Sequence, residues 1–150
     1  MRKILLSILL ITLAFASIAQ IKKPYTWTFT AKQLADNKYE VKFTVTIDKG
    51  WHIYSQHTPD GGPVATKFSF TANPLLTMVG KIKEVGKLES RFEKLFGVEV
   101  KQYSNKVEFT QIVQLKAKVK TNLAGTIEFM FCNDTECLPP SRQNFSVSLQ

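Results

Sequence analysis

The residues best suited to chemistry are Cys132 and Cys137, the two cysteines of the 150-residue chain, which four residues separate. The segment between them is rich in turn-forming residues, and Pro139 and Pro140, which lack amide donors, follow it. Two such thiols form a disulfide in an oxidising compartment. Because closing a loop of six residues adds only roughly 2 kcal/mol of stability, the spacing leaves two roles open, a local structural bond or a redox centre.

A zinc site is a third use of the same cysteines. His52 and His57 are also separated by four residues, and two thiolates with two imidazoles suit tetrahedral zinc. These gaps lie at the edge of the usual ligand spacing, and export would oxidise the thiols. We therefore expect no metal and no cofactor. His52 alternates with Trp51 and Ile53, which predicts a solvated histidine on the strand face that also carries Tyr54.

Export is indicated by the first nineteen residues. Arg2 and Lys3 precede an apolar run, and small residues follow it at Ser17 and Ala19, which is typical of a signal peptide cleaved after Ala19. We expect a periplasmic protein that starts at Gln20, with no membrane anchor, because no later stretch is apolar over the roughly 20 residues that a span requires. An exported chain with dispersed lysines is not expected to bind nucleic acid.

Alternation of apolar and polar residues predicts strands almost throughout residues 20–150, which we interpret as one domain. The expected strands are Tyr25 to Thr30, Tyr39 to Asp48, Trp51 to Tyr54, Thr66 to Phe70, Lys81 to Leu88, Val98 to Tyr103, Val107 to Val119, Thr126 to Cys132 and Asn144 to Leu149. Turn signals between them include Ser104-Asn105 and Asn122 to Gly125. The one short helix is expected at Ser90 to Phe96. The pattern predicts an all-β sandwich of eight or nine strands.

The core of this sandwich is expected to be rich in phenylalanine. The candidates are Phe29, Phe43, Phe68, Phe70, Phe109, Phe129 and Phe145. Continuing the alternation to Phe131 places Cys132 on the opposite face, with Glu128 and Met130. The sequence therefore predicts a cysteine pair that is reachable from outside.

Three segments together resemble the amino-terminal periplasmic domain of the thiol:disulfide interchange protein DsbD. They are Cys132 to Pro140, Gly50 to Tyr54, and Phe92 to Gly97 with the strand after it. The resemblance covers essentially all of the chain after the signal peptide. It implies an immunoglobulin-like sandwich whose exposed disulfide takes electrons from one thioredoxin-like domain and passes them to periplasmic oxidoreductases.

By position, the resemblance implies that Cys132 and Cys137 are the redox pair. His52 and Tyr54 would flank the pair, and a cap would contain Glu93, Leu95 and Phe96. The family often has a tyrosine at position 52 and an aromatic residue at position 95, so this chain departs from it at both. Asp134 and Glu136 lie between the cysteines, and their charge opposes thiolate formation.

The resemblance also implies the partners. These are thioredoxin-like periplasmic proteins or domains, including those of cytochrome c biogenesis, and a separate membrane electron donor, with this chain as a monomer. If it is an enzyme, it is a protein-disulfide reductase. The alternative is a binding or assembly module with a structural disulfide, in which Trp27, Trp51 and Tyr54 contact a glycan or a protein. No combination of residues indicates a hydrolase or a transferase.

Overall fold

The computed structural model describes residues 23–150, and the predicted signal peptide lies outside them. This part of the chain contains no helix, so no helix in it is long and apolar enough to cross a membrane. Its nine strands are β1 (Tyr25–Ala35), β2 (Lys38–Ile47), β3 (His52–Tyr54), β4 (Lys67–Phe70), β5 (Leu76–Glu93), β6 (Val98–Leu115), β7 (Thr121–Phe129), β8 (Phe131–Cys132) and β9 (Ser141–Leu149). The predicted all-β fold with eight or nine strands is confirmed.

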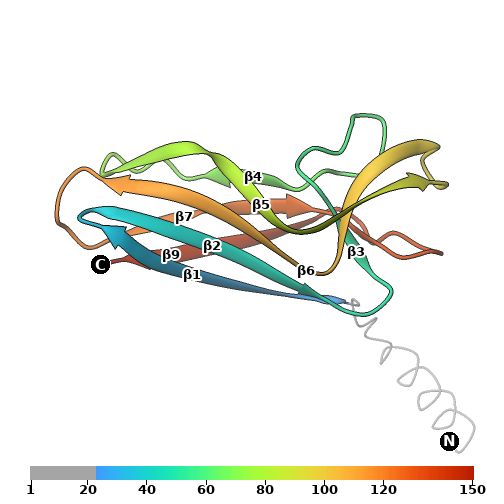
Figure 1. Cartoon of the computed structure of the whole chain (residues 1–150), viewed down its shortest axis with the longest axis horizontal. Coiled ribbons are helices and arrows are strands. Elements are labelled where there is room, and N and C mark those ends of the chain that lie inside the picture. Colours follow the sequence, from blue (N-terminus) through green and yellow to red (C-terminus); the bar gives the residue numbers. More distant parts are fainter. Residues whose placement is uncertain (1–22) are drawn as a thin grey trace, which may run out of the picture.

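The strands form two antiparallel sheets (Figure 1). In the larger sheet the order is β1-β2-β6-β3-β8, and β5 pairs with β6; the smaller sheet has the order β4-β7-β9. The long strand β6 organises the larger sheet because β2 and β3 pair with different parts of it, at residues 106–114 and 102–104. The architecture is the expected immunoglobulin-like sandwich.

The core between the sheets is built from alternate residues of each strand. Phe43, Phe109, Phe129 and Phe145 are buried in it. The other predicted core phenylalanines, Phe29, Phe68 and Phe70, are half-buried and pack against it. Each fully buried phenylalanine contributes about 1.5–3 kcal/mol, so this main core can hold the fold together without help from the cysteines.

Two predicted turns lie within strands. β6 continues through Ser104 and Asn105, and Asn105 adopts a φ of 63°, which asparagine tolerates. There the register with β5 shifts, so the turn-forming residue produces an irregularity in the strand instead of a reversal. β7 likewise continues through Gly125, where a Cβ would lie 2.3 Å from the carbonyl oxygen of Ser69. This glycine serves close strand packing, and the reversal occurs at residues 116–120.

The predicted helix at Ser90 to Phe96 is wrong. β5 extends to Glu93, and a turn then leads into β6, so the segment forms the tip of a long hairpin. Gly97 has a φ of 71°, and its amide donates to the carbonyl of Glu93 over 2.8 Å. The tip and the turn after β8 project at the same end of the sandwich (Figure 1).

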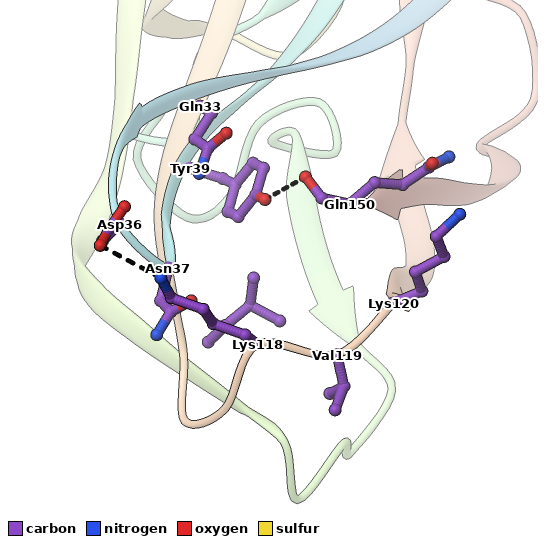
Figure 2. A pocket seen from close by; sticks show the side chains of 9 residues that line it. Gln33, Asp36, Asn37, Tyr39, Lys118, Val119, Lys120 and Gln150 are labelled. Carbon is purple, nitrogen blue, oxygen red and sulfur yellow. Dashed lines mark hydrogen bonds and ion pairs between the residues drawn. The ribbon is translucent and has the colours of Figure 1, made fainter.

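A shallow hollow of about 290 Å³ lies at the opposite end, beside the β1–β2 turn (Figure 2). Tyr39 donates a hydrogen bond there to the carbonyl oxygen of Gln150, and Lys118 pairs with Asp36 over 3.3 Å. No cysteine or histidine lines this hollow. This hollow is therefore separate from the cysteine pair and from both histidines.

Candidate functional site

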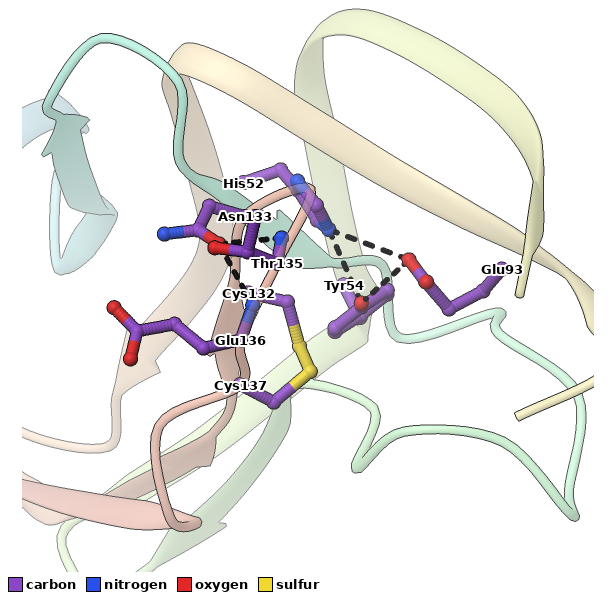
Figure 3. The surroundings of a disulfide bond; sticks show 8 residues. All are labelled: His52, Tyr54, Glu93, Cys132, Asn133, Thr135, Glu136 and Cys137. Carbon is purple, nitrogen blue, oxygen red and sulfur yellow. Dashed lines mark hydrogen bonds and ion pairs between the residues drawn. A yellow bond between two sulfur atoms is a disulfide. The ribbon is translucent and has the colours of Figure 1, made fainter. Parts of the chain in front are cut away.

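The two cysteines form a disulfide across a short turn that follows β8 (Figure 3). The Asn133 side-chain oxygen closes this turn by accepting hydrogen bonds from the amides of Thr135 and Glu136, each over 2.8 Å. The Asn133 amide donates to the Glu136 carbonyl, so Cys132 and Cys137 face each other as a pair of antiparallel residues. The expected disulfide is present, and an asparagine side chain organises its loop.

The prediction that both cysteines are reachable from outside is half wrong. Cys132 does point away from the main core, but it is 0% exposed, whereas Cys137 is half-buried. The chain leaves the smaller sheet after β7 and joins β3 in the larger one, which brings Cys132 against Tyr54 and Val100. This second buried cluster covers a face that alternation alone predicts to be solvated.

His52, Tyr54 and Glu93 form a buried polar group beside the disulfide (Figure 3). His52 Nε2 lies 3.1 Å from the Tyr54 hydroxyl and 3.7 Å from Glu93 Oε2. The Tyr54 hydroxyl donates to the same carboxylate oxygen over 3.3 Å. The structure therefore brings together three of the five flanking and cap residues.

His52 and Glu93 differ from their predicted environments. The histidine is 3% exposed instead of solvated, because β8 pairs along β3 and places Cys132 directly opposite it. Glu93 is 6% exposed because its carboxylate, at the end of β5, packs against Tyr54 and His52 of β3. The predicted helix would have distributed the side chains of Ser90 to Phe96 around its axis.

The electrostatics of this group keep the phenol and the imidazole uncharged. Burial raises the pKa of Tyr54, and the charge of Glu93 raises it further. Burial also lowers the pKa of His52, although the nearby Glu93 carboxylate opposes that effect. Near neutral pH the cluster thus combines a phenol that donates a hydrogen bond with a histidine that can still accept a proton.

Leu95 and Phe96 lie at the tip of the β5–β6 hairpin. Leu95 is 57% exposed and Phe96 is half-buried, so neither belongs to the buried main core. The cluster around the cysteines includes Val98 and Val100, which follow the tip along β6. Neither residue therefore anchors this segment in the main core.

An ion pair that the sequence did not predict joins the hairpin to the cysteine turn. Arg91 Nη2 lies 2.6 Å from Asp134 Oδ1, and the guanidinium lowers the pKa of that carboxyl group. Arg91 and Glu93 share one face of β5 and both reach toward the turn region. Interpreting this segment as a strand would have revealed that pattern, which the predicted helix concealed.

Glu84 is a second residue near the site that the sequence did not predict. Its carboxylate accepts hydrogen bonds from the Ser55 hydroxyl and the Gln56 amide, both over 2.7 Å, and from the Tyr103 hydroxyl over 2.8 Å. This network fixes the chain where it leaves β3. Farther along the same loop, a Cβ at Gly62 would lie 2.9 Å from Val98, so the loop packs against the strand that covers Cys132.

The alternative uses of these residues have less support. Both cysteines are consumed by the disulfide, His57 is exposed, and residues 23–150 contain no group of three or more potential ligands arranged for a metal ion. Of the three aromatic residues of the binding-module alternative, Trp51 and Tyr54 are buried, and Trp27 is half-buried and packs against the main core. They do not form an exposed aromatic surface.

Comparison with known families places these observations in context. The sequence model described as "Thiol:disulfide interchange protein DsbD, N-terminal" matches residues 19–149. The chain belongs to this family. The DsbD family is one of thiol–disulfide exchange proteins, and the disulfide of this chain agrees with that membership. No curated protein sequence matches the chain significantly.

Solved structures show the same fold at low identity. The N-terminal periplasmic domain of ScsB from Proteus mirabilis is 18% identical, with a TM-score of 0.59 over 85% of this chain and 47% of that chain. The reduced DsbD N-terminal domain from Neisseria meningitidis is 17% identical, with a TM-score of 0.55 over 83% and 85% of the two chains.

A third structure contains a DsbD N-terminal domain in complex with the PilB N-terminal domain, also from Neisseria meningitidis. It is 15% identical to this chain, with a TM-score of 0.53 and 87% of both chains covered. The chain thus spans about half of the ScsB structure and most of the two DsbD-related ones.

Proposed function

We propose that this chain is a periplasmic redox domain that relays reducing equivalents between thioredoxin-like proteins through the Cys132–Cys137 disulfide. The unequal burial of the two cysteines carries this proposal. Cys137 is half-buried at the edge of a short turn, while Cys132 is fully buried beside titratable groups. Membership of the DsbD family supports the same interpretation.

The unequal burial assigns different roles to the two sulfurs. An incoming partner thiolate attacks Cys137, because that cysteine is the more exposed of the two. A bond forms between the partner sulfur and Cys137 Sγ, the disulfide breaks, and its electron pair stays on Cys132 Sγ as a thiolate. The second thiol of the partner then displaces Cys137, and the partner leaves oxidised while both cysteines of the domain are left reduced.

The hairpin tip acts in this proposal as a cap. Leu95 and Phe96 lie at the tip, and the Arg91–Asp134 ion pair holds the hairpin against the cysteine turn. A docking partner must displace the tip to align its thiolate with the S–S axis, and Gly97 provides backbone freedom for that motion. The ion pair is exposed at both ends, so displacing it costs little.

Glu93 handles protons in the same scheme. Its carboxylate accepts a hydrogen bond from Tyr54 and lies in the buried group next to the cysteines. Thiol–disulfide exchange requires protons to leave attacking thiols and return to leaving thiolates. Glu93 accepts and returns such a proton. Burial raises the pKa of Tyr54, so the phenol stays protonated and orients the Glu93 carboxylate through its hydrogen bond.

The partners follow from the chemistry of the site. Residues 23–150 hold one disulfide, Cys132–Cys137, and the donor and acceptor in this proposal are thioredoxin-like dithiols. The complex of a DsbD N-terminal domain with the PilB N-terminal domain supports docking of another domain on this fold. We propose that the electrons originate from a separate membrane protein and that the domain acts as a monomer.

Trapping with single-cysteine variants tests the relay. Cys132→Ala leaves the more exposed Cys137 free. This variant is expected to form a mixed disulfide with a thioredoxin-like domain whose resolving cysteine has been removed and whose remaining cysteine carries thionitrobenzoate, which the Cys137 thiolate displaces as the leaving group. Cys137→Ala leaves only the buried Cys132 and should form several-fold less of the mixed disulfide. Equal trapping by both variants would contradict the assigned roles, and trapping by neither would contradict the relay.

The reduction potential separates the relay from the structural alternative. A structural disulfide in an exported protein is expected below roughly −300 mV, whereas a relay disulfide is more oxidising. Equilibration of the purified domain with dithiothreitol redox buffers, followed by mass spectrometry after alkylation, measures it. A value well below that limit would support the binding-module alternative.

A further inference from the structure

His52 is placed to sense the redox state of the disulfide. It lies directly opposite Cys132 in the pairing of β3 with β8. Directly opposed residues of antiparallel strands share a face, with Cβ atoms about 4.5–5.5 Å apart. The imidazole is almost fully buried, so the neighbour of the buried sulfur is a side chain that changes its charge near neutral pH.

The surroundings of His52 carry an excess of negative charge. On its own strand it faces Tyr54, and β6 contributes Ser104 and Gln102, which do not titrate. The charged groups that act on it come from β5 and from the cysteine turn; they are Glu89, Arg91, Glu93 and Asp134. The single guanidinium already binds Asp134, and Lys87 lies 3.5 Å from Glu89. Glu93 is therefore the carboxylate of this set whose ion-pair partner is His52 itself. A new thiolate at Cys132 would add to this uncompensated charge.

We infer that His52 takes up a proton when the disulfide is reduced and balances the charge of the Cys132 thiolate as an imidazolium. This inference rests on the proposed redox function. The partner dithiol supplies two electrons and two protons and leaves as a disulfide. In the reduced domain one proton resides on Cys137 and the other on the imidazole of His52, beside the Cys132 thiolate.

The contacts of the imidazole suit both of its charge states. In the oxidised domain burial lowers the pKa of His52, so the ring stays neutral. Its Nε2 atom already lies 3.7 Å from Glu93 Oε2 and 3.1 Å from the Tyr54 hydroxyl. A protonated ring therefore finds a carboxylate in place, and opening the disulfide adds a second anion across the strand pair.

Imidazole titration by NMR tests this inference in the wild-type protein without any partner. The chain has only two histidines, and His57 is exposed, so it provides an internal reference. On reduction with dithiothreitol the pKa of His52 is expected to rise by about one pH unit or more, as for groups coupled through a nearby charge. That of His57 should not change. A His52 pKa that is the same in both redox states would overturn the inference.

Variants show whether the thiolate causes the shift. In the double variant Cys132→Ala, Cys137→Ala, dithiothreitol should leave the His52 titration unchanged. In a Cys137→Ala background, thiolate absorbance should report Cys132 ionising at a pH about one unit lower with His52 present than with His52→Gln. The matched control His57→Gln should leave this midpoint unchanged. Identical midpoints for the two histidine variants would overturn the inference.

The proposed function and this inference fail in different ways. Trapping by Cys137 combined with an unchanged His52 titration would leave the relay standing and refute the role of His52. A shifted His52 titration without any trapping would show coupling between the histidine and the thiolate in a domain that does not exchange with the tested partner class.

Discussion

Removal of both cysteines should leave the fold intact at a modest cost in stability. The disulfide closes a loop of six residues, which corresponds to about 2 kcal/mol of unfolded-chain entropy. Cys132 is also fully buried, and losing the contacts of its sulfur adds about 1 kcal/mol. We therefore expect the Cys132→Ala, Cys137→Ala variant to lose about 3 kcal/mol, out of the 5–15 kcal/mol typical of a domain.

The division of the interior into two clusters explains why the loss should stay this small. The main core packs between the sheets and contains no cysteine, while Cys132 belongs to the separate cluster with Tyr54 and Val100. Alanine is preferable to serine at position 132, because a serine hydroxyl buried there without a partner would cost a further 1–3 kcal/mol, roughly. The substitution should leave cooperativity unchanged.

Urea denaturation followed by circular dichroism measures the loss. Reduced wild-type protein provides the matched control, because it lacks the closed loop but keeps both sulfur atoms. It should lose about 2 kcal/mol, and the variant about 1 kcal/mol more. A variant without a cooperative transition, or one that loses about twice the expected 3 kcal/mol or more, would show that the disulfide is structural and that the two clusters do not behave independently.

Four further predictions address other parts of the chain. Replacing Leu95 and Phe96 together by alanine should speed reduction by dithiothreitol several-fold with almost no change in melting temperature, because Leu95 is 57% exposed and neither lies in the main core; a large loss of stability without faster reduction would contradict the cap. Gly125→Ala should destabilise the domain by about 1–3 kcal/mol in urea denaturation, because the added Cβ would collide with the backbone of β4, which cannot move aside without disturbing the sheet; an unchanged midpoint would contradict this packing. The pKa of His52 lies below its unfolded value of about 6.5, so the unfolded chain binds the proton more readily and the oxidised domain loses stability as the pH falls through this range. The His52→Gln variant should therefore lose less stability than the wild type between pH 7.5 and 5.5. An equal loss would contradict the lowered pKa of His52. Intact-mass analysis of protein from the native host should show a chain that begins at Gln20, and a full-length chain would contradict export.

The sequence alone was sufficient for the fold class and the cysteine pair. Alternation of apolar and polar residues is a local property of a strand with one buried face, so it identified nearly every strand and most of the core phenylalanines. The spacing of Cys132 and Cys137 likewise brings the two thiols together within one short turn. The signal peptide remains a prediction of the sequence.

The environment of the site depended on the tertiary structure. The chain crosses from the smaller sheet to the larger one after β7, and this crossing decides which side chains contact Cys132. No local sequence pattern predicts the crossing. It buries His52 beside a sulfur atom and brings Glu93 to Tyr54 from a strand about forty residues away. Side-chain periodicity determines only which face a residue occupies; burial and pKa depend on what packs against that face, and contacts between distant segments decide both.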